Sequence, residues 1–165
     1  MSTARLLRAW WLALACALLL AGCATPPRTP SAPGAQSWSG RLALNVEGRA
    51  NQSFSAGFEL KGAPEAGELT LTNPLGGTAA VLAWSPGTAT LRANGTTRQF
   101  ASLEELAQEA TGAPLPVASL FDWLAGKATP VSGWGVDVSS VADGRLHAQR
   151  TTPPPLVDLR VVFEH

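Results

Sequence analysis

The stretch LTLTNPLGGTAAVLAW, residues 69–84, contains two short apolar segments joined by a turn. On each side of the turn apolar residues lie at every second position, which is the period of a strand with one buried face; they are Leu69 and Leu71 before it, and Ala80, Leu82 and Trp84 after it. Asn73-Pro74 begins the turn, and Gly76-Gly77 tolerates positive φ. Leu75 lies at the turn's tip, where no apolar neighbour shields it. We therefore predict an antiparallel hairpin with a leucine exposed at its tip.

The same period of two continues on both sides of this hairpin. It recurs over residues 38–47, 54–61, 88–100, 134–138, 145–150 and 157–164. Asn94-Gly95 is a strong hairpin signal inside the third of these ranges. Short turns separate most neighbouring segments, which predicts about nine antiparallel strands, mostly in a meander.

Two short helices interrupt the strands. Ser102 and Glu105 have the spacing of a capping box, and the apolar residues that follow have helical spacing up to Gly112. Pro116 opens a second amphipathic segment that ends at Gly126. The two apolar stripes are Leu103, Leu106, Ala107 and Ala110, then Val117, Leu120, Phe121 and Leu124.

A sheet that is apolar on one face must cover that face. Two short helices are small for this task, so we predict a mainly β fold: an unclosed antiparallel barrel of about nine to eleven strands, with a helical lid over an apolar cavity. The candidate cavity residues are Leu42, Leu44, Phe54, Phe58, Leu69, Leu71, Leu82, Trp84, Leu120, Phe121 and Trp134. For each of them the alternative is plain core packing, and for the fold the alternative is a simple closed core.

The N-terminus has the pattern of an export signal. Arg5 and Arg8 precede an apolar run that ends in Leu-Ala-Gly-Cys, which resembles the bacterial lipobox. We expect residues 1–22 to be a lipoprotein signal peptide, Cys23 to carry the lipid, 23–37 to be a flexible Pro-rich tether, and 38–165 to form one domain. By resemblance to enterobacterial sorting rules, an aspartate after the lipidated cysteine favours retention in the inner membrane, so Ala24 is compatible with export to the outer membrane.

Charge and composition exclude several classes. The chain has 165 residues with 12 basic and 12 acidic side chains; because Arg5 and Arg8 leave with the signal, we expect a slight acidic excess, which argues against nucleic-acid binding. Cys16 is lost with the signal and Cys23 carries lipid, so no disulfide or cysteine metal site is expected. The only histidines are His147, which we expect on an exposed sheet position, and His165. No catalytic motif is present, so we expect neither an enzyme nor a cofactor.

Four segments together resemble the LolB family of outer-membrane lipoproteins: Trp38-Ser-Gly-Arg41, the stretch 69–84, the capped helix ending at Thr111-Gly112, and APLPVASLFDWLAGKA at 113–128. The resemblance implies an unclosed barrel with an apolar cavity for acyl chains, in a monomer at the periplasmic face of the outer membrane. Its partners would be a LolA-like periplasmic carrier, acylated lipoproteins and outer-membrane lipids. The loop Asn73, Pro74, Leu75 and Gly76 would act in membrane insertion. LolA shares the fold but lacks the lipid anchor and the protruding loop. The family barrel has eleven strands, more than the nine counted here.

Two other functions are compatible with the residues. One is a structural or assembly-partner lipoprotein with a filled core. The other is a carrier of a different amphiphile, such as a glycolipid.

Overall fold

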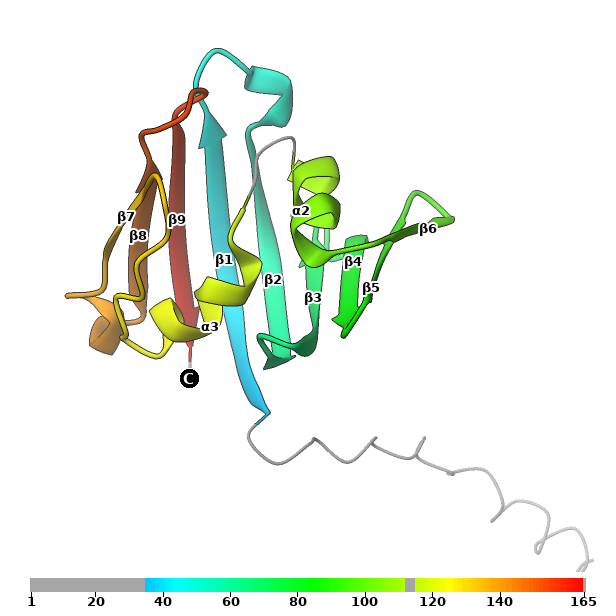
Figure 1. The fold of residues 1–165 in the computed structure, drawn as a ribbon, viewed down its shortest axis with the longest axis horizontal. Helices are drawn as coiled ribbons and strands as arrows, with labels where there is room; N and C mark the ends of the chain where they lie inside the picture. The colour runs from blue at the N-terminus through cyan, green and yellow to red at the C-terminus, as the bar shows by residue number, and fades with distance from the viewer. Residues whose placement is uncertain (1–34, 112–114, 165) are drawn as a thin grey trace, which may run out of the picture. The chain divides into compact units, whose positions relative to one another are not determined.

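The structure, a computed structural model, describes residues 35–111 and 115–164. Nine strands form one antiparallel sheet in this part of the chain (Figure 1). They are β1 (Gln36–Val46), β2 (Phe54–Ala63), β3 (Ala66–Thr72), β4 (Thr78–Ser85), β5 (Thr88–Ala93), β6 (Thr96–Phe100), β7 (Trp134–Asp137), β8 (Arg145–Arg150) and β9 (Val157–Glu164). The predicted mainly β class and strand number are confirmed. The expected signal peptide, Cys23, Gly112 and His165 lie outside the described residues.

The first and last strands meet in the middle of the sheet. The order is β6-β5-β4-β3-β2-β1-β9-β8-β7, and β1 pairs with β9 from Val46–Val157 to Ser39–Glu164. The meander was predicted, but the pairing of β1 with β9 was not. Because β6 and β7 are the two edges, the sheet is unclosed, as predicted. β1 also includes residues 36 and 37, which we had placed in the tether; they pair with Gly62 and Lys61.

Strict alternation gives this sheet one buried face. In β9 the side chains of Val157, Leu159, Val161 and Phe163 are buried. Gly40 is required where β1 meets β9, because a Cβ at this position would lie 2.1 Å from the carbonyl oxygen of Val162. The side chain has to be absent for the two central strands to pair.

Two helices lie against the buried face (Figure 1): α2 (Leu103–Thr111) and α3 (Val117–Leu124). The capping pair of α2 is present, since the Glu105 N–H donates to Ser102 Oγ at 3.1 Å. The Glu105 carboxylate accepts from the Ala101 N–H, also at 3.1 Å, one residue earlier than in the standard box. After α3, Gly126 has φ +81° and donates its N–H to the Trp123 carbonyl. Two 3-10 turns, η1 (Ala50–Gln52) and η2 (Val141–Asp143), complete the elements. None of the helices in the described ranges combines the length and the apolar character needed to cross a membrane.

Candidate functional site

The loop between β3 and β4 is held in a fixed turn by Asn73. Its side-chain oxygen accepts the N–H groups of Leu75 and Gly77, each at 3.0 Å. Its backbone N–H donates to Gly77 O at 2.8 Å, and its carbonyl accepts from the Gly76 N–H at 2.9 Å. Gly76 has φ +85°, a conformation that favours glycine. The turn is therefore ordered by its own hydrogen bonds and by Pro74, without help from an apolar core.

Leu75 projects from this turn and is 96% exposed. Asn73, Pro74, Gly76 and Gly77 are exposed as well. None of these side chains carries a charge, so the tip presents one aliphatic group on a neutral, hydrogen-bonded base. Transfer of such a side chain from water into an apolar layer is worth about 1.5–3 kcal/mol.

The eleven residues predicted to line a cavity all belong to the covered face or to its lid. Nine are buried, and Phe54 and Trp134 are half-buried. The α3 residue Phe121 packs between two rings of the sheet, with its centroid 5.7 Å from that of Trp38 and 6.1 Å from that of Trp84, both edge-on. These residues thus contact one another and the lid, and the open cavity that we predicted between them stays a prediction. Trp38, a ring partner of Phe121, was missing from our candidate set although its alternation had placed it on this face.

Side-chain contacts hold the two helices in place. Trp123 of α3 is fully buried; its Nε1 donates to the Thr129 carbonyl at 2.8 Å, and its ring lies 6.0 Å from Trp134 of β7. On the other side, Arg98 of β6 forms an ion pair with Glu109 of α2 at 2.9 Å. Both partners of this pair are about half exposed, so it contributes little to stability.

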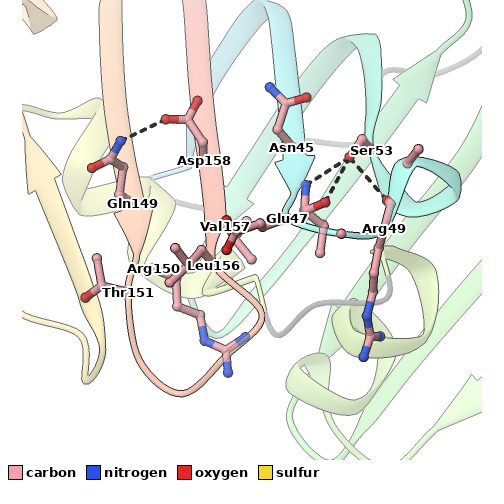
Figure 2. A pocket seen from close by; sticks show the side chains of 13 residues that line it. Asn45, Glu47, Arg49, Ser53, Gln149, Arg150, Thr151, Leu156, Val157 and Asp158 are labelled. Carbon is pink, nitrogen blue, oxygen red and sulfur yellow. Dashed lines mark hydrogen bonds between the residues drawn. The ribbon is translucent and has the colours of Figure 1, made fainter.

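A pocket of about 690 Å³ opens between the segment after β1 and the segment joining β8 to β9 (Figure 2). Its apolar wall includes Val46, Leu156 and Val157, and Arg49 and Arg150 contribute the basic side chains. The Glu47 N–H donates to the Leu156 carbonyl at 2.9 Å, which links the two segments. None of the predicted cavity residues lines this pocket. The pocket was not predicted, because it depends on the β1–β9 pairing, which has no local sequence signal.

Asp158, at the pocket's margin, is the hub of a polar cluster. One carboxylate oxygen lies 2.7 Å from His147 Nε2 and accepts from Gln149 Nε2 at 3.0 Å. The other forms an ion pair with Arg160 Nε at 2.9 Å. Partial burial favours the neutral acid, but the hydrogen bonds from Gln149 and His147 and the charge of Arg160 outweigh it, so the pKa of Asp158 lies below its ordinary value. His147 is half-buried, whereas an exposed position was expected, and it has a carboxylate partner that we did not predict.

Comparisons with known proteins point to one family. A family model described as "Outer membrane lipoprotein LolB" matches residues 35–153. A protein of Bordetella petrii is 37% identical over 178 residues, covering 92% of this chain and 89% of its own. One of Chromobacterium violaceum is 36% identical, covering 84% and 77%, and one of Cupriavidus metallidurans is 34% identical, covering 81% and 68%. All three carry the name outer-membrane lipoprotein LolB.

Proposed function

The chain belongs to the LolB family of outer-membrane lipoproteins, and from this premise we propose that it receives acylated lipoproteins from a LolA-like periplasmic carrier and inserts them into the outer membrane. In this proposal residues 1–22 are removed, Cys23 holds the chain to the membrane through lipid, and the tether lets the domain reach a carrier. The acyl chains of the cargo lie against the covered face of the sheet during transfer. No step of this cycle requires catalysis.

The size of the hydrophobic penalty explains why such a receptor is needed. Burial of each CH₂ is worth about 0.8 kcal/mol, so three acyl chains of about fifteen carbons represent on the order of 35 kcal/mol. A triacylated protein therefore cannot cross water with its chains exposed. The chains have to pass from one apolar container directly into another, and apolar contacts suit this exchange because they are non-directional.

The covered face supports the proposal through the chemistry of its side chains. Leu42, Leu44 and Leu60 lie at the centre of the sheet, and the rings of Trp38 and Trp84 flank Phe121. An acyl chain that replaced the Phe121 ring would exchange one apolar contact for another, so the burial lost would be largely recovered. We therefore propose that α3 moves when cargo loads.

Leu75 is the observation that carries the insertion step. Leu75 is 96% exposed on a neutral turn held by Asn73, so burial of its side chain does not stabilise the fold. Transfer of this apolar side chain from water into an acyl layer is favourable. We propose that Leu75 enters the outer membrane and brings the loaded face to it.

Replacing Leu75 with Glu tests this step. Transfer of a fluorescent lipoprotein from a loaded LolA-like carrier onto the chain should proceed at the normal rate. The following insertion into liposomes should slow by about tenfold or more, because the favourable transfer of Leu75 is replaced by an unfavourable one.

Val162→Glu is the matched control, since Val162 is 59% exposed on β9 and outside the loop. It should insert cargo at the wild-type rate. If Leu75→Glu also inserts cargo at that rate, the proposed role of the loop is wrong.

The packing of Phe121 against Trp38 and Trp84 also favours a second candidate, an assembly-partner lipoprotein with a permanently filled core. Mass spectrometry of organic extracts from the purified membrane-derived protein separates the candidates. Acylated cysteine peptides support the carrier role. A bound glycolipid indicates another cargo, and protein that cannot be loaded with any amphiphile supports the filled core.

A further inference from the structure

Arg150 is a buried cation at the end of an apolar face. It is the last residue of β8, and the strand's alternation places it on the same face as the buried Leu146 and Ala148. Its side chain is 7% exposed. Within residues 35–111 and 115–164, its Nη1 atom has no hydrogen-bond partner and is closed to solvent. The residues paired with it across the sheet are Trp134 and Val157, which are both apolar.

A second arginine on the same face, Arg98, has partners for its charge. Arg98 pairs opposite Leu91 on β5, reaches Glu109 of α2 at 2.9 Å and lies over the Phe100 ring at 5.1 Å. It is also half exposed, so water solvates the rest of its guanidinium. Arg150 has a buried Nη1 and no such carboxylate among the described residues. Unpaired buried cations are strongly disfavoured, so a residue of this kind indicates that a partner arrives from elsewhere.

The strand register places Arg150 level with Val46 at the end of β1, whereas the Leu75 loop begins level with Arg41, in the middle of that strand. β1, β3 and β8 run parallel to one another through antiparallel neighbours, and they end at Val46, Thr72 and Arg150. The contact of Phe121 with the rings of Trp38 and Trp84 lies toward the opposite end from Arg150, since Trp38 is near the start of β1. From Trp38 to Val46 the strand covers about 26 Å, at about 3.3 Å per residue. The face thus has a polar end and an apolar end along one strand.

We propose that the Arg150 guanidinium binds the ester carbonyl oxygens at the glyceryl end of the bound acyl chains. This inference rests on the proposed function and gives the cargo an orientation. The ester groups lie at the Arg150 end, and the hydrocarbon tails extend toward Trp38 and Trp84, whose rings contact Phe121 in the structure. The diacylglyceryl group of an acylated cysteine and that of a phospholipid share these esters.

The test compares two synthetic probes on wild type and Arg150→Met. One probe is a dipalmitoylglyceryl-cysteine peptide with two ester carbonyls, and the other is its dialkyl ether analogue, which lacks them. The wild type should bind the ester about tenfold or more tightly than the ether, because a hydrogen bond from a charged donor is lost. Arg150→Met should bind both probes with equal affinity. Arg160→Met, which removes an arginine from the opposite face, should keep the wild-type preference.

Stability of the unloaded protein gives an independent readout. Because Arg150→Met replaces an unpaired buried charge with an apolar side chain, its melting temperature without ligand should equal or exceed that of wild type. If the role of Arg150 were purely structural, Arg150→Met would have a lower melting temperature than wild type and a lower affinity for both probes. If Arg150→Met does not fold, the structural role is established and the inference fails. Arg150→Lys, which keeps the charge but lacks the planar fork, should retain part of the ester preference.

The outcomes separate this inference from the proposed function. Equal affinity of the wild type for ester and ether overturns only the role of Arg150. Failure of the wild type to bind either probe overturns the proposed function with it. Phosphatidylglycerol and its diether analogue show whether a phospholipid ester is bound as the lipopeptide ester is. Dodecyl phosphate binding that depends on Arg150, without an ester preference, would assign the guanidinium to a phosphate and contradict the proposal.

Discussion

At the scale of single residues, the proposed functional roles belong to side chains whose surroundings are unusual for their type. Leu75 is apolar and exposed, and Arg150 is charged and buried. The first was predictable, because Asn-Pro and Gly-Gly specify a turn and turns lie at the surface. The second was not, because Arg150 follows the alternating pattern of β8 and its burial depends on where the neighbouring strands pair.

The Asp158 cluster predicts how the folding stability depends on pH. The pKa of Asp158 is lowered in the folded chain from an ordinary value of 3.8, so the folded state favours the carboxylate. The stabilisation is complete above that ordinary value and is lost as the pH falls through the lower, folded pKa. Urea unfolding of wild type and Asp158→Asn should therefore differ most at about pH 5 and converge toward about pH 2. A difference in unfolding free energy that stays constant over this range would contradict the shift.

At the scale of elements, the lid is the part that the sequence indicates but does not position. The capping residues Ser102 and Glu105 and the apolar stripes predict two short helices, and the structure confirms both. The insertion of Phe121 between Trp38 and Trp84 could not be read from spacing, because the two tryptophans are 46 positions apart in the sequence. The register of β1 and β4, and not local propensity, brings them together.

Phe121→Ala tests whether this contact is a lid contact or a permanent core. Without ligand, the variant should lose about 3–5 kcal/mol of stability, as expected for a buried ring. Because acyl chains would then fill the space that the ring leaves, a saturating dipalmitoyl lipopeptide should raise its melting temperature more than it raises that of wild type. Differential scanning calorimetry measures both shifts.

Val117→Ala is the control for this experiment, since Val117 lies on the same helix and is equally buried but does not take part in either of these ring contacts. It should show the ligand-dependent shift of wild type. An equal shift in Phe121→Ala and wild type would favour the permanently filled core.

At the scale of the whole molecule, one-sided alternation specifies a curved antiparallel sheet with a covered face, and this much was predicted from the sequence. The joining of β1 to β9 was not, because pairing between the ends of a chain leaves no local signal. It has consequences for the site: it requires Gly40, and it aligns Arg150 with Val157 and Val46 at one end of the sheet. The candidate cavity residues all lie on the covered face or on the lid, and the cavity itself stays a prediction.

The most direct test of the central claim is a crystal structure of the chain bound to a dipalmitoylglyceryl-cysteine peptide. We predict acyl-chain density along the covered face, between Trp38 and Trp84, with Phe121 displaced from its position 5.7 and 6.1 Å from their rings. Lipopeptide bound elsewhere, with Phe121 still between the two tryptophans, would contradict the account.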